Sequence, residues 1–166
     1  MSDLPSLGPR GEGWVAIQAA VLLAIGVAGP LTGTLGGGDR LDAAAGAAGI
    51  ALLIAGIAML LAGAALAVRG AVDLRGALTP LPHPRDDAEL IEDGVYARAR
   101  HPIYGGLILG SLGWALLWLS ATALLLAAGL AIFFRLKSAR EEHWLMERFP
   151  GYAAYRRRTH RFLPLP

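Results

Sequence analysis

The amino-acid sequence predicts an all-α, multi-pass transmembrane helical bundle of about four spans. Hydrophobic residues make up 55% of the chain and charged residues only 17%, whereas about a quarter of the residues in an average soluble domain are charged. Three segments contain no Asp, Glu, Lys, Arg or His, namely Trp14–Leu31, Ala43–Val68 and Ile103–Phe134, and each is long enough to cross a bilayer as a helix. We expect a single membrane domain, 1–166, divided into N-terminal spans (1–75) and a C-terminal core (76–166).

The third apolar segment is too long for one crossing. Its roughly 32 residues would form a rod of about 48 Å, so we expect a hairpin of two short spans that turns near Ser120. Most Lys and Arg residues lie in 69–102 and 135–166, and the positive-inside rule places both segments in the cytoplasm. An even number of crossings must separate them. The sequence therefore predicts four spans in the cell membrane with both termini cytoplasmic.

Composition also excludes several classes of chemistry. The chain has no cysteine, which rules out a thiolate nucleophile, a disulfide or a cysteine-ligated metal, and we assign no metal site. Its formal charge of +2 is too small to suggest nucleic-acid binding. Because the spans carry no ionisable residue, ion or proton transport is disfavoured. No signal-peptide pattern precedes the first span, so we expect that span to stay in the protein.

Glycines recur where helices would need to touch. Gly49, Gly56 and Gly63 follow a seven-residue spacing in the second span, and the third span contains Gly106 and Gly110. Small residues let helix backbones approach closely in lipid. We interpret these glycines as packing positions.

Candidate site residues gather in the two cytoplasmic segments, which hold all four histidines. In the first, Pro80, Pro82 and Pro84 favour an extended path. His101-Pro102 then opens the third span, where proline suits the first helical turn and free N–H groups attract anions. His101 and Tyr104 would alternatively be interfacial anchors.

The second cytoplasmic segment continues the last span as a helix. At 100° per residue, Arg135 and Glu142 share an otherwise apolar arc with Ser138, Leu145, Met146 and Phe149. A charge in such an arc needs a ligand or a partner, and a mutual Arg135–Glu142 ion pair is the alternative to a site. The basic tail with Tyr152 and Tyr155 would lie on anionic headgroups or fold back as a lid.

Taken together, these motifs resemble the membrane-embedded isoprenylcysteine carboxyl methyltransferases and phospholipid methyltransferases. The resemblance rests on an Arg-His-Pro-x-Tyr turn (100–104), a Glu-Glu pair (141–142) and a Tyr-x-x-Tyr pair (152–155), in that order around a hairpin. It covers roughly residues 76–164 and is fairly specific in combination.

The resemblance implies S-adenosylmethionine as methyl donor in a cytoplasmic pocket, and a lipidic or amphipathic small-molecule acceptor that arrives through the bilayer. Glu142 would lie nearest the transferred methyl group, with Arg135 or Lys137 as its basic partner. The residues implied in cofactor binding are Tyr96, Arg100, His101, Pro102, Tyr104, Gly105 and Glu141.

Two other functions remain open at this point. A membrane reductase with a related core would bind NADPH in the same place, although such enzymes are longer. A non-catalytic membrane protein would use the same residues only for turns and ion pairs. The sequence does not define the acceptor or the oligomeric state.

Overall fold

The computed structural model describes residues 7–9, 11–33, 46–74 and 90–164; the extended path expected at Pro80–Pro84 lies outside them. The described residues form helices and no named strand. These are α1 (Glu12–Thr32), α3 (Ala47–Asp73), the 3-10 turn η2 (Gly94–Ala97), α4 (Pro102–Leu117), α5 (Ala121–Arg148) and α6 (Tyr152–Arg158). The predicted all-α, multi-pass architecture is confirmed.

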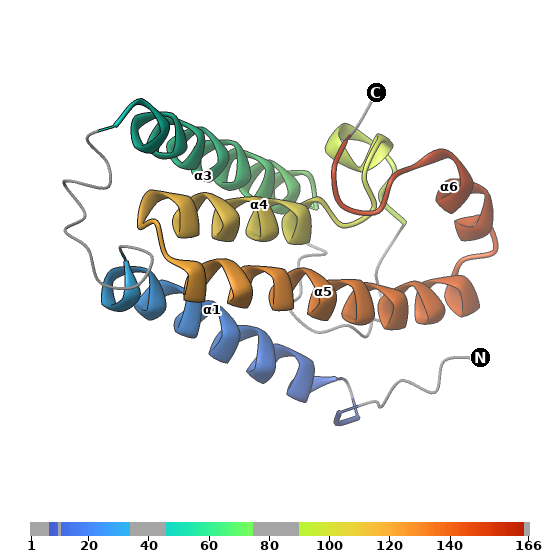
Figure 1. Cartoon of the computed structure of the whole chain (residues 1–166). Helices are drawn as coiled ribbons and strands as arrows, with labels where there is room; N and C mark the ends of the chain where they lie inside the picture. The colour runs from blue at the N-terminus through green and yellow to red at the C-terminus, as the bar shows by residue number, and fades with distance from the viewer. Residues whose placement is uncertain (1–6, 10, 34–45, 75–89, 165–166) are drawn as a thin grey trace.

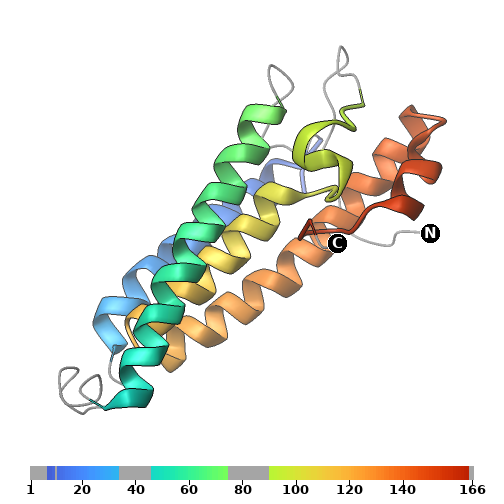
Figure 2. The ribbon, with the colours of Figure 1, turned by 90° about the horizontal axis from the view of Figure 1, so that it is seen from above.

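The four long helices are arranged in the order α1, α5, α4, α3. Helix α1 packs on α5, α5 packs on α4, and α4 packs lengthwise against α3, as Figures 1 and 2 show. Helix α4 is therefore the central element of the bundle. The end of α5, the short helix α6 and η2 gather at one end, opposite the turn between α4 and α5.

The apolar segment 103–134 forms the predicted hairpin. Helix α4 ends at Leu117, and α5 begins directly after Ser120, whose hydroxyl oxygen accepts a hydrogen bond from the Ala123 N–H at 3.0 Å. The Thr32 hydroxyl lies 2.7 Å from the Ser120 hydroxyl. This contact joins the last turn of α1 to the hairpin turn.

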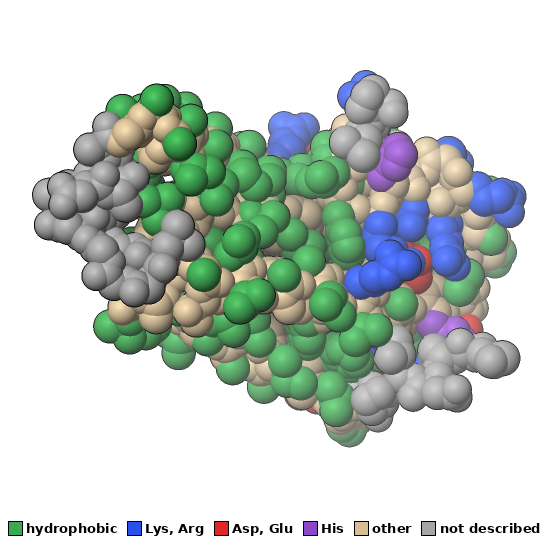
Figure 3. All heavy atoms as spheres, viewed as in Figure 1, with side chains coloured by type: hydrophobic (Ala, Val, Ile, Leu, Met, Phe, Trp, Pro, Cys, Tyr) green, Lys and Arg blue, Asp and Glu red, His purple; other side chains and the backbone are tan. Residues whose placement is uncertain are grey.

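The outer surface of the bundle suits lipid. Helices α1, α3 and α5 are long and apolar enough to cross a membrane, and α4 is a shorter apolar helix of about 24 Å. Large apolar side chains such as Leu31, Ile54 and Leu125 point outward, and most side chains on the face of the bundle drawn in Figure 3 are hydrophobic. In water this exposure would be unfavourable, so the chain is a membrane protein.

Helices α3 and α4 approach closely because glycines line their contact. A Cβ added at Gly63 would lie 2.5 Å from the Gly106 carbonyl oxygen, and one at Gly56 would lie 2.9 Å from the Gly113 carbonyl oxygen. No side chain larger than hydrogen fits at these points. The predicted role of Gly56, Gly63 and Gly106 in helix packing is confirmed.

Candidate active site

The turn that leads into α4 is anchored to the end of α3. Gly94 has a φ of 57°, and a Cβ there would clash with the Asp73 carboxylate. The same carboxylate accepts a hydrogen bond from the Val95 N–H at 2.8 Å. Tyr96 is buried, and its hydroxyl donates to the Gly70 carbonyl at 3.3 Å. These contacts fix the chain just before Arg100 and His101.

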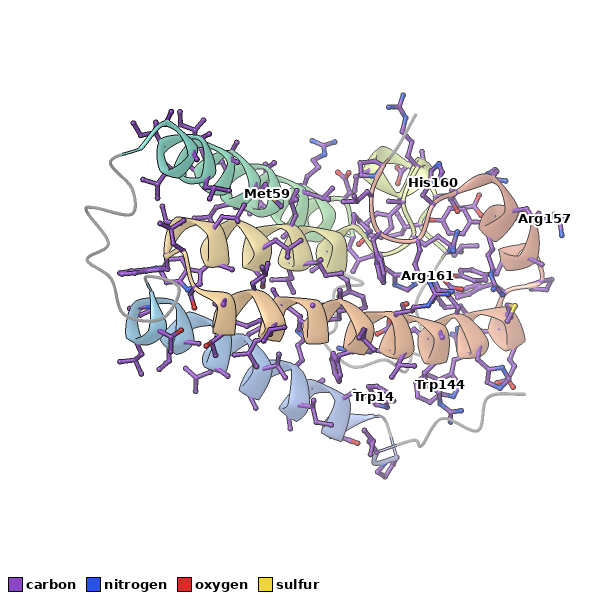
Figure 4. All side chains as sticks on the ribbon, in the orientation of Figure 1. Trp14, Met59, Trp144, Arg157, His160 and Arg161 are labelled. Atoms are coloured by element: carbon purple, nitrogen blue, oxygen red, sulfur yellow. The ribbon has the colours of Figure 1, made fainter. Side chains whose placement is uncertain are left out.

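The C-terminal segment runs beside this turn and is bound to it through the backbone. The His160 N–H donates to the Arg98 carbonyl at 2.8 Å, and the Arg100 N–H donates to the His160 carbonyl at 2.9 Å. The His101 N–H donates to the Arg161 carbonyl at 2.8 Å. In Figure 4, the labelled Arg161 lies on this segment, close to α5. The tail therefore folds back onto the start of α4.

His101 bridges the two neighbouring acids of α5. Its Nδ1 lies 3.3 Å from Glu141 Oε2, and its Nε2 lies 3.3 Å from Glu142 Oε1. The Tyr104 hydroxyl donates to Glu141 Oε1 at 2.5 Å. Because His101 precedes α4 and the acids lie on α5, the hairpin brings the Arg-His-Pro-x-Tyr turn and the Glu-Glu helix together.

Three arginines surround the Glu142 carboxylate, which is 2% exposed. Its oxygens lie 3.0 Å from Arg100 Nε, 3.2 Å from Arg161 Nη2 and 3.3 Å from Arg156 Nε. Arg100 also donates to the Thr159 carbonyl. Figure 3 shows Lys and Arg side chains gathered around an acidic side chain at this end of the molecule. A carboxylate with three guanidinium partners is stabilised in its charged form.

The pKa of His101 reflects two opposing effects. Burial lowers the pKa, but the hydrogen bonds that His101 donates to Glu141 and Glu142, and the negative charges of these two residues, outweigh burial. The net direction of the pKa shift is therefore upward from 6.5. A raised pKa favours the imidazolium, which donates from both ring nitrogens. One cation then connects the two carboxylates.

Aromatic side chains separate this polar cluster from the membrane core of the bundle. The Tyr104 ring is stacked on Phe134 with centroids 4.4 Å apart and on His101 with centroids 5.6 Å apart. Phe162 and Tyr104 both pack against the buried apolar cluster around Leu130 and Phe134. The charged groups therefore lie directly beside an apolar region.

The structure brings most of the predicted site residues together. Arg100, His101 and Glu142 are in direct contact, and Pro102 is the first residue of α4, as expected. Tyr96 lies in η2 and accepts a hydrogen bond on its carbonyl from the Tyr155 hydroxyl at 2.8 Å. A Cβ on Gly105 would clash with the Phe162 carbonyl, so Gly105 allows the C-terminal segment to approach.

Arg135 differs from the expectation. Its side chain is exposed, and its carbonyl accepts a hydrogen bond from Arg161 at 3.1 Å. Among the described residues, the arginines paired with Glu142 are Arg100, Arg156 and Arg161. Arg135 is therefore not the basic partner of Glu142, a role that the sequence left open between Arg135 and Lys137. Arginines from other segments reach the carboxylate, and α5 buries Phe134 and Ser138 while Arg135 stays exposed.

The predicted site residues do not include four contributors to the cluster. Arg156 and Arg161 pair with Glu142, Thr159 binds Arg100, and Tyr152 is buried beside them. The Tyr-x-x-Tyr pair and the basic run were visible in the sequence, but both also fit headgroup binding. Only the folding back of the tail distinguishes the two interpretations.

Comparison with known proteins now identifies the family. Residues 51–151 match the phospholipid methyltransferase family, which is more than half of the chain, and the chain belongs to this family. The predicted resemblance is thus confirmed. The match begins inside α3 and ends before α6, and so includes both the Arg-His-Pro-x-Tyr turn and the Glu-Glu pair.

Two curated proteins are similar over a shorter region. The nickel-cobalt-cadmium resistance protein NccN of Alcaligenes xylosoxydans xylosoxydans is 35% identical over 81 residues, which is 48% of this chain and 38% of NccN. The cobalt-zinc-cadmium resistance protein CzcN of Cupriavidus metallidurans gives the same figures. The similarity thus spans well under half the length of these relatives.

Proposed function

We propose that this chain is an integral membrane methyltransferase that uses S-adenosylmethionine and acts on a small lipidic or amphipathic acceptor, resembling an isoprenylcysteine carboxylate or a phospholipid. One observation carries the proposal: His101 touches both Glu141 and Glu142 at 3.3 Å. Two of the three motifs that carry the resemblance, the Arg-His-Pro-x-Tyr turn and the Glu-Glu pair, thus form one polar cluster beside the apolar interior. Membership of the phospholipid methyltransferase family supports the same activity.

The residues present fit the proposed donor. S-adenosylmethionine carries a carboxylate, an ammonium, ribose hydroxyls, an adenine ring and a sulfonium. The cluster offers guanidinium groups for the carboxylate, glutamates for the ammonium or hydroxyls, and aromatic faces for the cationic sulfur. In addition, the Tyr152 hydroxyl is buried and has no hydrogen-bond partner among the described residues. A buried polar atom left without a partner is unfavourable, and a polar ligand group would satisfy it.

We assign the roles in the proposed reaction from the contacts of each residue. When bound, S-adenosylmethionine supplies a methyl group activated by the sulfonium. Arg100, His101 and Glu141 would hold the donor, together with Tyr96, Pro102, Tyr104 and Gly105 at the start of α4. Glu142 orients the arginines and contributes negative charge near the reacting centre. Arg135, being exposed, retains at most an outer role at the rim of the site.

The apolar side of the site suits a lipidic acceptor. Phe134, Tyr104 and Phe162 lie between the charged cluster and the bundle interior, and they exclude water from the polar groups that they cover. Methyl transfer depends mainly on alignment of the two reactants. A carboxylate acceptor needs no general base, whereas an amine or hydroxyl must lose a proton. Burial raises the pKa of Glu142, but His101 and Arg100 outweigh this effect and lower the pKa to about 2, so Glu142 is a weak base for that step.

Transfer of a labelled methyl group tests the proposal. Membranes that contain the wild-type protein should incorporate label from S-adenosylmethionine, and Glu142→Gln should lower the rate about a hundredfold. His101→Ala should also lower it, while Arg148→Gln, an exposed change on the same helix, should not. The chemical class of the labelled product identifies the acceptor.

A folded Glu142→Gln/His101→Ala double variant with wild-type transfer would refute the proposed site. Oxidation of NADPH by the purified protein, without methyl transfer, would instead favour the reductase.

A further inference from the structure

A polar contact joins helix α1 to the interior near the site. Gln18 is the only amide side chain in the otherwise apolar stretch 15–31. Its Oε1 accepts a hydrogen bond from Lys137 Nζ at 2.6 Å. Lys137 lies on α5 and is 0% exposed. Burial of an ammonium group costs free energy, so stability of the α1–α5 contact alone gives no reason for a lysine there.

Lys137 also connects to the site through Tyr104. Its ammonium nitrogen lies 5.0 Å from the centroid of the Tyr104 ring, which is within the range of a cation–π interaction. It is also close enough to Glu141 for an electrostatic interaction. Tyr104 donates to Glu141, and Glu141 pairs with His101. A continuous set of contacts therefore runs from Gln18 on α1 to His101.

We propose that Lys137, held by Gln18, is a positioning residue that sets the orientation of Tyr104 and the charge environment of the Glu141–His101 pair, so that α1 completes the site. Only the effect of Lys137 on methyl transfer rests on the proposed function; its effect on Tyr104 and the Glu141–His101 pair does not. Helix α1 lies before the region 51–151 that matches the family. The part of the site that α1 supplies is therefore additional to the family motifs.

The proposal differs from a purely structural link in the direction of its effects. Lys137→Met removes a cation near Glu141, and the carboxylate then interacts more strongly with His101. Gln18→Leu removes the partner that draws the ammonium toward α1, and Lys137 then pairs more closely with Glu141 and competes with His101. The two substitutions should move the His101 pKa in opposite directions. If the substitutions only loosened the α1–α5 contact, the His101 pKa would shift in the same direction in both variants.

The test is an NMR titration of histidine-labelled protein in detergent, with the His101 signal identified by its loss in His101→Ala. We expect the His101 pKa to rise by about half a pH unit or more in Lys137→Met and to fall in Gln18→Leu. In the double variant, Gln18→Leu should have no further effect, because it acts through Lys137. Arg148→Met, which removes an exposed positive charge from the same helix, is the matched control.

An unchanged His101 titration in both single variants, or shifts of the same sign, would overturn the inference. If Lys137→Met does not fold, the inference is overturned when the His101 pKa does not fall in Gln18→Leu. This measurement needs neither donor nor acceptor, so it decides the positioning role even if the protein transfers no methyl group. Where donor binding is found, Lys137→Met should weaken it about tenfold, and Arg148→Met should leave it unchanged.

Discussion

The protonation of His101 connects the residues of the site to the stability of the protein. Its pKa is raised in the folded state, because Glu141 and Glu142 outweigh the effect of burial. Protonated His101 therefore contributes stability that is fully present below the unfolded pKa of about 6.5. The contribution decreases as pH rises through the higher folded pKa.

We expect wild-type protein to lose stability over this pH range relative to His101→Gln, which does not titrate there. Thermal unfolding in detergent, measured for both proteins from pH 5 to about 9, gives the difference directly. A difference between the two proteins that is independent of pH would contradict a charged His101 between the two glutamates.

At the scale of single residues, local patterns made Glu142 and His101 candidates, since the first is a charge in an apolar arc and the second opens a helix before proline. The family resemblance then gave both residues a role in a site. The arginine partners of Glu142 were not predictable in the same way. Arg156 and Arg161 reach the carboxylate only because the tail is hydrogen-bonded to residues 98–101. Helical periodicity describes one helix and says nothing about which distant segment returns to it.

At the scale of helices, the α3–α4 contact should be the most sensitive to added side-chain volume. Gly63→Ala places a methyl group 2.5 Å from the Gly106 carbonyl oxygen and the Gly110 nitrogen. We expect destabilisation of about 1–3 kcal/mol, despite the better helix propensity of alanine. Gly26→Ala on α1 is the control, since its Cβ would meet nothing within 4 Å.

Unfolding of both variants in detergent would measure these effects. Equal stability of Gly63→Ala and Gly26→Ala would show that α3 and α4 are not packed backbone to backbone.

The hairpin could be predicted because two independent observations indicate it: the length of the apolar segment 103–134 and the distribution of Lys and Arg on both sides of this segment. A segment of 32 apolar residues is too long for one crossing, and Ser120 is a favourable residue before a helix. Helix α6 was not predicted. Its seven residues are too few for a clear periodic pattern, and three consecutive arginines fit a headgroup-binding tail equally well.

At the scale of the whole molecule, the fold predicts a specific topology in the membrane. The hairpin turn should lie on the outer side, and the site end, with α6, should lie in the cytoplasm, as proposed from the distribution of Lys and Arg. The chain has no cysteine, so each introduced cysteine is a unique probe. Ala121→Cys places a probe at the first residue of α5, and Gly151→Cys places one just beyond its other end. Both native residues are exposed.

A membrane-impermeant thiol reagent should label Ala121→Cys in intact cells and Gly151→Cys only after permeabilisation. Labelling of both from the same side would rule out the proposed crossing of α5.

The order of the helices in the bundle was beyond the reach of the sequence. Apolar spans of similar composition give no preference among neighbours, and the pairing of α3 with α4 depends on glycines that match only in three dimensions. The position of α1 against α5 depends on contacts such as Gln18–Lys137, which join residues far apart in the chain.

The most direct test of the central claim is calorimetric titration of the purified protein with S-adenosylmethionine, its demethylated product and NADPH. We predict that the first two bind to the wild type, that Glu142→Gln and His101→Ala weaken this binding at least about tenfold, and that NADPH does not bind. Absence of binding by either adenosyl compound, or equal affinity in the wild type and both variants, would contradict a methyl-donor site between the His101 turn and the Glu142 helix.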